Sequence, residues 1–224
     1  DNLDAAFAQY KYCFYFVERM KENMTNRGEY TNLCVESLNL NGVNSEKMFL
    51  LENYVIENEP DVLLLQETKI NVDSLPPNMN LAGYNLDVKE RTSEQKAGGG
   101  LAMYWKEQIA AKPWSNPKTM LNKDQMNEIQ WILLESGTSR LAIGNVYMAC
   151  QNNKTKGHVE WNTSLYNQLK DDINVLRDMN LGIIVAGDYN AWIGQIKGME
   201  TNHPTCNENG KMLKDLVANE ELFI

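Results

Sequence analysis

The sequence predicts an α/β protein, and three observations lead to this class. Short apolar runs at residues 62–65 and 183–186 lack polar alternation, which is typical of strands buried on both faces of a sheet. Longer segments at residues 45–59 and 160–179 carry apolar side chains at helical spacing. The chain has 224 residues, of which 43% are hydrophobic and 23% charged, so it can bury a core of its own.

The chain is predicted to begin with an N-terminal helical extension at residues 1–30, followed by the main domain at residues 31–224. Apolar side chains recur at helical spacing over residues 4–24, and the polar segment 26–31 is expected to be a linker. We expect this helix to pack or dock against a partner rather than to carry a site. Its apolar stripe comprises Phe7, Tyr10, Phe14 and Val17.

The main domain is predicted to start with a strand, a helix and a second strand. Residues 33–40 alternate enough for a strand, and residues 62–65 form the second one. The helix at residues 45–59 can be capped by Asn44 or Ser45. Its inward side is predicted to carry Phe49, Leu50, Tyr54 and Val55.

The middle of the chain is predicted to be β-structure. Strands are expected at residues 84–88 and 101–105, and residues 128–135 and 140–147 are expected to pair as a hairpin. The glycines at residues 98–100 lack the Lys-Ser/Thr ending and the following helix of a phosphate-binding P-loop. We therefore interpret them as a close approach of two backbone segments at the start of a strand.

The last part of the chain is predicted to contain two helices and two strands. The helix at residues 160–179 precedes the strand at residues 183–186, and a final helix begins at Glu208 or Asn209. The terminal residues 222–224 are apolar, although chain ends are normally polar. We expect these residues to begin another strand.

Several predicted strands end in an amide or a carboxylate. Asp188 and Asn190 follow one strand, and they project to the same side if the backbone stays extended. The alternative is an Asx-turn, in which both side chains bond their own backbone. Asn39 and Asn41 have the same spacing, and Glu67 follows another strand. Because α/β proteins gather ligand groups at strand ends and Mg²⁺ prefers oxygen ligands, the sequence predicts a magnesium site there.

The composition limits the possible functions. A net charge of −9 does not indicate a dedicated nucleic-acid-binding protein, so a phosphate-handling role would need a bound cation or a local basic patch. The four cysteines lack paired spacing, which argues against a zinc site or disulfide framework and favours a nuclear or cytoplasmic location. No apolar run approaches the roughly 20 residues that cross a bilayer, so we expect no membrane partner.

Four short motifs follow one another in a characteristic order: LNLNG at residues 38–42, QETK at 66–69, NVY at 145–147 and GDYNA at 187–191. In this order the chain resembles the endonuclease/exonuclease/phosphatase superfamily. The closest likeness is to the apurinic-type endonuclease domain of LINE-like (non-LTR) retrotransposons and to host proteins derived from them. The KAGGGLA segment that starts at Lys96 is similar to that branch as well. The resemblance covers residues 31–224.

The resemblance implies an α/β (α+β) fold in which a two-sheet β-sandwich is flanked by helices, in four layers. It also implies a phosphodiester hydrolase that depends on Mg²⁺, or on Mn²⁺ in its place, and nicks DNA. The metal site would consist of Glu67, the principal ligand, and Asn39 beside it, which would hydrogen-bond the surroundings of the metal. Asn41 would lie near Asn39 and support it.

The catalytic residues implied by the resemblance are Asp188, Asn190, Tyr147 and Asn39. Asp188 would orient or deprotonate the attacking water, and Asn190 would hold water and phosphate in line. Tyr147 would donate a hydrogen bond to the phosphate. Phosphodiester cleavage needs such a positioned water and a cation against the developing negative charge.

The chain departs from the family at its C-terminal side. A metal-side Asp and a later Ser-Asp-His are not found in it, so we expect a truncated domain without the closing C-terminal strands and with little or no nicking activity alone. The two histidines, His158 and His203, are expected to be surface residues. Tyr147 is followed by Met148 and Ala149, where the family usually has Ala-Pro.

Two other functions are considered. The first is a phosphoesterase that acts on lipid, inositol phosphate or RNA. The second is a domesticated, non-catalytic module that binds another protein through the first helix and open sheet edges. DNA is the expected partner, and a protein partner or the remainder of a longer polyprotein would complete the fold.

Overall fold

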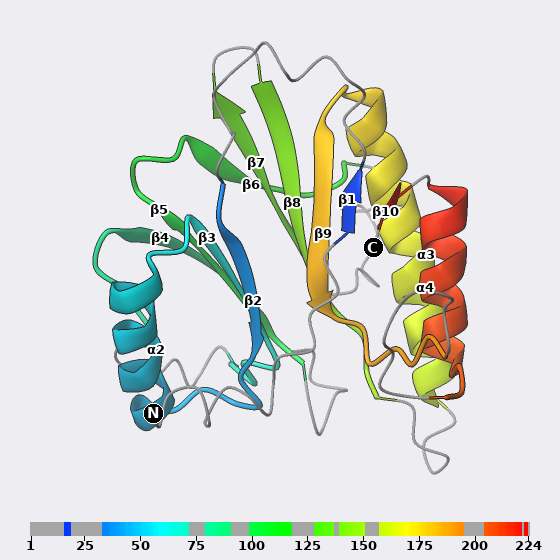
Figure 1. The fold of residues 1–224 in the computed structure, drawn as a ribbon, viewed down its shortest axis with the longest axis horizontal. Coiled ribbons are helices and arrows are strands. Elements are labelled where there is room, and N and C mark those ends of the chain that lie inside the picture. The colour runs from blue at the N-terminus through cyan, green and yellow to red at the C-terminus, as the bar shows by residue number, and fades with distance from the viewer. Residues whose placement is uncertain are drawn as a thin grey trace.

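A computed structural model describes residues 16–18, 33–71, 79–90, 99–117, 128–136, 139–150, 157–194, 204–220 and 222–223. Within these ranges the chain forms two β-sheets that lie face to face, with helices on their outer sides (Figure 1). None of the helices in these ranges is long and apolar enough to cross a membrane.

The four-stranded sheet has the order β2-β3-β5-β4. Its first two strands are parallel, and the other pairs are antiparallel. Helix α2 (Ser45–Asn58) connects β2 to β3, and the side chain of Asn44 caps its first turn by accepting a hydrogen bond from Lys47 N. The strands are β2 (Val35–Asn39), β3 (Val62–Gln66), β4 (Tyr84–Lys89) and β5 (Leu101–Lys106).

The six-stranded sheet has the order β10-β1-β9-β8-β7-β6. Strands β8 and β9 are parallel and are connected by helix α3 (Gly157–Asp178), and helix α4 (Glu208–Asn219) follows β9. The predicted hairpin is confirmed, because β7 and β8 pair along their whole length. The strands are β1 (Phe16–Glu18), β6 (Ala111–Trp114), β7 (Ile129–Ser136), β8 (Ser139–Tyr147), β9 (Gly182–Asp188) and β10 (Leu222–Phe223).

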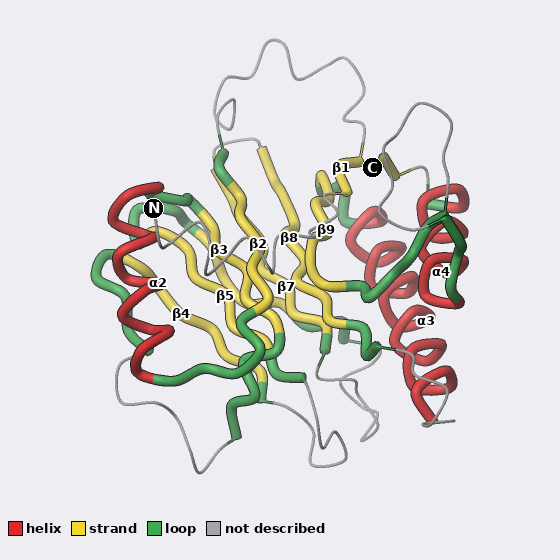
Figure 2. Tube along the Cα trace, turned by 60° about the horizontal axis from the view of Figure 1, so that its bottom comes forward, coloured by secondary structure: helices red, strands yellow, loops and turns green. Residues whose placement is uncertain are grey.

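Three apolar clusters hold the layers together. One lies between the two sheets and includes Leu64 and Ile143, a second joins α2 to the four-stranded sheet, and a third joins α3 and α4 to the six-stranded sheet. Figure 2 shows α2 on one side of the sheets and α3 and α4 on the other. The predicted four-layer sandwich is therefore confirmed. The buried stripe of α3 is Leu165, Leu169, Ile173 and Leu176, as its sequence spacing predicts.

Three local predictions need correction. Phe16–Glu18 lie within the predicted first helix but form strand β1 between β9 and β10, because pairing with two strands overrides helical spacing; the rest of that segment lies outside the described residues. Phe49 was expected to point inward but is 63% exposed, because the inward stripe of α2 is Met48, Leu51 and Val55. Strand β6 is an edge strand containing Pro113 and was not predicted.

The strand arrangement brings several carboxyl ends to one end of the sandwich. In the six-stranded sheet Tyr147 lies opposite Asp188, and in the four-stranded sheet Asn39 lies opposite Gln66. Gly187 permits this pairing, because its φ is +149° and a Cβ atom there would lie 2.0 Å from the carbonyl oxygen of Val146. These strand ends therefore meet where the sequence motifs place their polar residues.

Candidate functional site

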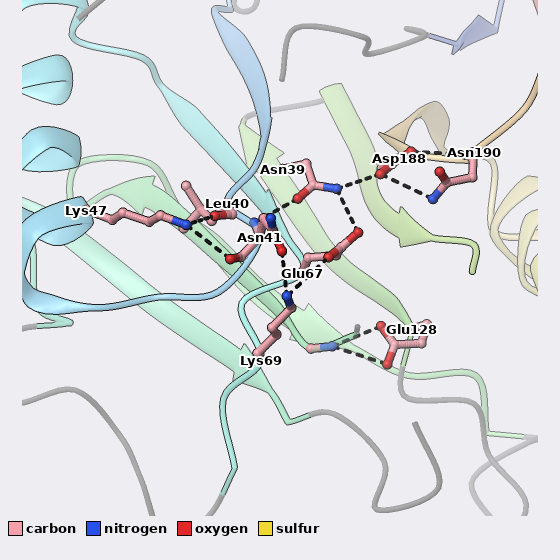
Figure 3. A network of polar contacts seen from close by, with 10 residues as sticks. Asn39, Leu40, Asn41, Lys47, Glu67, Lys69, Glu128, Asp188 and Asn190 are labelled. Atoms are coloured by element: carbon pink, nitrogen blue, oxygen red, sulfur yellow. Dashed lines mark hydrogen bonds and ion pairs between the residues drawn. The ribbon is translucent and has the colours of Figure 1, made fainter. Parts of the chain in front are cut away.

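The Asn39 side chain connects the two sheets at this end of the sandwich. Its Nδ2 donates to Oε1 of Glu67 at 3.1 Å and to Oδ2 of Asp188 at 2.6 Å (Figure 3). Asn39 and Asp188 are 149 residues apart in the sequence and belong to different sheets. The structure therefore brings together the side chains of Asn39, Glu67 and Asp188, as the sequence predicts.

The Asp188 carboxylate has two different environments at its two oxygens. Oδ1 accepts a hydrogen bond from the backbone N–H of Asn190 at 2.9 Å, which is the Asx-turn considered as an alternative. Oδ2 faces Asn39 and lies 3.4 Å from Nδ2 of Asn190. The φ of Asn190 is +46°, so of the two alternatives left open by the sequence the structure has the Asx-turn, and the two side chains still meet. Burial raises the pKa of Asp188, and the Asn190 N–H and Asn39 counteract part of this rise.

Glu67 stands one residue beyond strand β3 on a left-handed backbone with φ +49°. The N–H groups of the next two residues, Thr68 and Lys69, donate to the carbonyl oxygens of Gly100 and Gly99 at 3.0 and 2.9 Å. The interpretation of this glycine segment as a close backbone approach is confirmed for Gly99 and Gly100, whereas Gly98 lies outside the described residues. The Glu67 side chain is 17% exposed, so it is accessible to a small ligand.

Left-handed backbone is concentrated around this site. Among the described residues other than glycine, those with positive φ are Asn41, Glu59, Glu67, Lys69, Asn180 and Asn190. Glu59 is the C-cap of α2, and Asn180 follows α3, whereas the other positions surround Asn39. Each such residue costs on the order of 1 kcal/mol, and such strain clusters at functional sites.

Two lysines form a local basic patch beside Asn41. The Nζ atom of Lys69 donates to Oδ1 of Asn41 and lies 3.8 Å from Oε2 of Glu67. Lys47 extends from α2 and donates to the backbone oxygens of Leu40 and Asn41, as Figure 3 shows. Burial and the neighbouring Lys69 lower the pKa of Lys47. This patch supplies local positive charge in a chain whose net charge is −9.

Asn41 supports Asn39 by a route that its sequence spacing does not predict. Its φ is +47°, and its backbone N–H donates to Oδ1 of Asn39 at 2.9 Å. This contact occupies the amide oxygen of Asn39 and turns the amide nitrogen toward Glu67 and Asp188. The arrangement suits the hydrogen-bonding role of Asn39 beside the metal better than direct coordination, because an N–H group cannot coordinate a cation.

Tyr147 and Glu128 lie on the six-stranded side of the site. Tyr147 is buried, and burial together with the charge of Glu67 and a hydrogen bond to it raises the pKa of Tyr147, so the hydroxyl keeps its proton. Glu128 is 0% exposed, and burial raises its pKa to about 7, with Gly100 and Lys89 acting in the opposite direction. Sequence reasoning did not identify Glu128, because a single Glu before a strand gives no sign of burial.

A buried polar contact joins the sheets beneath these side chains. Nε2 of Gln66 donates to Oδ1 of Asn145 at 2.7 Å and to Oγ of Ser37 at 2.9 Å. Nδ2 of Asn145 donates to the backbone oxygens of Leu65 and Ala102 at 3.1 and 3.2 Å. Because Gln66 precedes Glu67 and Asn145 lies two residues before Tyr147, this contact holds both halves of the site in register. In the sequence both residues stand in the QETK and NVY motifs, but neither motif indicates that their side chains bond to each other.

The donor set at the site fits a hard divalent cation. Across the described part of the chain, no three His, Cys, Asp or Glu residues gather as a ready-made metal cluster. Mg²⁺ needs fewer protein ligands, because it is usually held by one or two carboxylates together with water and substrate phosphate. Glu67 and Asp188, joined through Asn39, meet this requirement. His203 lies outside the described residues, and His158 is in the first turn of α3.

Comparison with known proteins agrees with the fold and identifies the family. The profile of the endonuclease/exonuclease/phosphatase family matches residues 37–209. Among curated proteins, a sequence search finds no match to this chain. The chain belongs to the endonuclease/exonuclease/phosphatase family, whose enzymes are hydrolases that generally depend on a divalent metal.

Solved structures with the same fold include enzymes that act on DNA. The AP endonuclease of Leishmania major shares 18% identity at a TM-score of 0.64, over 83% of this chain and 65% of that one. The 3′ phosphatase NExo from Neisseria, bound to a product DNA hairpin, shares 18% identity at a TM-score of 0.54, over 84% of this chain and 71% of that one. The endonuclease domain of TRAS1, a telomere-specific non-LTR retrotransposon, shares 16% identity at a TM-score of 0.53, over 82% of this chain and 70% of that one. The chain thus spans 65% of the Leishmania enzyme.

Proposed function

We propose that the chain is the endonuclease domain of a retroelement or of a protein derived from one, and that it cleaves phosphodiester bonds of DNA with Mg²⁺. The observation that carries this proposal is the Asn39 amide, which donates to one carboxylate from each sheet. A purely structural role would not require Glu67 and Asp188 to face one another at a strained strand end. Bound Mg²⁺ would supply positive charge against the charge that develops on the phosphate.

The residues of the chain divide the remaining work. Glu67 binds the cation, and Asn39 orients Glu67 and Asp188 toward it. Asp188 accepts the proton of the attacking water, a role that its raised pKa favours. Tyr147 keeps its proton and donates to a phosphate oxygen, and Asn190 holds the water and phosphate in line.

DNA is proposed as the substrate from two observations. Lys47 and Lys69 place positive charge beside the carboxylates, where a nucleic-acid backbone would pass. The structures with the same fold include a DNA-bound phosphatase and a retrotransposon endonuclease domain. We expect slow nicking by these 224 residues, because the Ser-Asp-His that the resemblance implies, and with it the acid-base histidine, is not found in this sequence.

Relaxation of supercoiled plasmid tests the proposal. At high protein concentration with Mg²⁺, the chain should nick the plasmid slowly, and EDTA, Glu67→Gln or Asp188→Asn should each lower the rate by roughly 100-fold or more. Glu135→Gln is the matched control, because Glu135 is an exposed carboxylate that pairs with Lys112 and Arg140 on the surface. Its rate should equal that of the wild type.

The proposal fails if nicking persists in EDTA or if Glu67→Gln nicks at the wild-type rate. It also fails if the chain hydrolyses RNA or an inositol phosphate in a Glu67-dependent reaction but leaves DNA intact. That outcome would favour the phosphoesterase function considered from the sequence.

A further inference from the structure

Glu128 is a buried carboxylate that the proposed reaction does not use. It is 0% exposed and directly precedes strand β7. Burying a carboxylate is costly unless hydrogen bonds or charges compensate, so a fold without a use for it would be better served by an apolar residue. The position of this carboxylate therefore calls for a function.

The Glu128 side chain connects the two sheets of the sandwich. Both of its carboxylate oxygens accept the backbone N–H of Gly100, at 3.2 and 3.1 Å. Gly100 precedes β5 in the four-stranded sheet, whereas Glu128 precedes β7 in the six-stranded sheet. Figure 3 shows this contact close to Lys69 and Glu67. The carboxylate thus ties the two sheets together beside the site.

Gly100 is in turn hydrogen-bonded to the backbone directly after Glu67. The carbonyl oxygens of Gly100 and Gly99 accept the N–H groups of Thr68 and Lys69. Gly99 and Gly100 have φ values of +87° and +84°, so their conformation depends on such external contacts. The backbone of Glu67 is itself in the left-handed region. If Thr68 and Lys69 lost their hydrogen bonds to Gly100 and Gly99, the Glu67 backbone would relax away from this conformation.

The backbone of Glu128 holds a second part of the site. Its carbonyl oxygen accepts the N–H of Tyr147 at 3.0 Å. One residue therefore fixes Tyr147 through its main chain and the Glu67 loop through its side chain.

We propose that Glu128 is a positioning residue that holds the Gly99–Gly100 segment and thereby aims the Glu67 carboxylate at the divalent cation. This inference rests on the proposed function, because it takes Glu67 as the metal ligand. Residues that orient metal ligands typically contribute 10- to 100-fold to metal affinity.

The test combines Mn²⁺ affinity with amide hydrogen exchange at Thr68 and Lys69. Glu128→Met keeps the volume and removes both acceptors, so exchange at these two amides should rise by about 10-fold or more and Mn²⁺ affinity should fall by about 10-fold. Glu128→Gln keeps one acceptor oxygen for Gly100 and should restore most of both properties. Glu128→Asp retracts the carboxylate by one methylene group. Its amide exchange and Mn²⁺ affinity should lie between those of the Met and Gln variants.

Asp172→Asn is the matched control. Asp172 is also a buried carboxylate with a raised pKa, but it accepts hydrogen bonds from Asn116 and Trp131 on the α3 side of the six-stranded sheet. This variant should leave Mn²⁺ affinity and the exchange of Thr68 and Lys69 at their wild-type values.

The outcomes separate the inference from the proposed function. Wild-type exchange and affinity in Glu128→Met, or in Glu128→Asp if the Met variant does not fold, would overturn the inference alone. Equal changes of amide exchange and Mn²⁺ affinity in Glu128→Gln and Glu128→Met would also overturn the inference, because the acceptor oxygen retained by Gln should preserve most of both properties. Absence of Glu67-dependent Mn²⁺ binding in the wild type would overturn the proposed function and this inference together.

Discussion

The two halves of the site are held in different ways. On the six-stranded side, Tyr147 and Asp188 are the last residues of two parallel strands and lie opposite each other in the sheet. On the four-stranded side, Glu67 lies beyond the end of β3, and hydrogen bonds from neighbouring loops hold its left-handed backbone. The first half is set by the sheet itself, and the second is set by contacts among loops.

This difference predicts which property each substitution affects. Changes on the six-stranded side disturb the packing of the sheet, so they should lower global stability. Changes around Glu67 disturb only the loops that aim it, so they should lower metal affinity with less effect on folding. Variants at both halves can confirm or refute this division.

The largest expected effect is that of Gly187→Ala. A Cβ atom at this position would lie 2.0 Å from the backbone oxygen of Val146, so the β8–β9 pairing must shift. We expect a loss of about 4 kcal/mol in the free energy of unfolding, measured in urea. Gly83→Ala is the control, because Gly83 has φ +81° but nothing within 4 Å, and it should cost about 1 kcal/mol. Equal losses in the two variants would show that steric contact at Gly187 is unimportant.

A pH-dependent effect is expected from Glu128. Its folded-state pKa of about 7 is above the ordinary value of 4.5, so the folded state binds the proton more tightly than the unfolded state. The contribution of the Glu128 carboxyl group to the free energy of unfolding is fully present below pH 4.5 and is lost as the pH rises through about 7. Relative to Glu128→Gln, the wild type should therefore lose about 3 kcal/mol between these pH values.

Urea unfolding of the wild type and Glu128→Gln across this pH range measures the effect without metal. Gly100, Lys89, Glu67 and Tyr147 surround position 128 in both proteins, so contributions from groups other than Glu128 largely cancel in the difference. A difference that stays constant from pH 4.5 to 7 would contradict the raised pKa of Glu128.

Asn39→Asp is expected to have an intermediate effect that depends on metal. The substitution replaces the donor between Glu67 and Asp188 by a third carboxylate, so it should lower stability by about 2 kcal/mol in EDTA. Saturating Mn²⁺ should recover most of this loss, because the cation attracts the added charge. A loss that Mn²⁺ leaves unchanged would indicate that the carboxylates do not share a cation.

The smallest expected effect is that of Asn190→Gly. Glycine accepts the φ of +46° but loses the hydrogen bond from Asn190 Nδ2 to the backbone oxygen of Met148, so stability should fall by about 1 kcal/mol. Asn190→Ala should cost about 1 kcal/mol more, because alanine is disfavoured in the left-handed region. Identical unfolding curves for the two variants would argue against this backbone conformation.

The sequence was sufficient to predict most strands of the sandwich, because its central strands are apolar and buried on both sides. Strands β3, β5, β8 and β9 were predicted close to their observed ends for this reason. The exceptions lie at sheet positions that local spacing does not determine. Strand β6 is short, lies at an edge and contains Pro113, and β1 has apolar spacing that also suits a helix.

The candidate site was predicted as a set of residues but not as a geometry. Short motifs identified Asn39, Glu67 and Asp188, and the sheets bring these residues together. The sequence left an extended spacing and an Asx-turn open at Asp188 and Asn190, because the same residues suit both, and the structure has the Asx-turn. Glu128 was missed because its carboxylate is bonded to Gly100, which precedes a strand of the other sheet and is distant in the sequence.

The most direct test of the central claim is the Mn²⁺ affinity of variants from both sheets, measured by calorimetry. If Glu67 and Asp188 act on one cation, Glu67→Gln should weaken binding by about 100-fold and Asp188→Asn by about 10-fold, whereas Glu135→Gln should bind as the wild type does. Wild-type affinity in either Glu67→Gln or Asp188→Asn would contradict a shared cation between the two sheets.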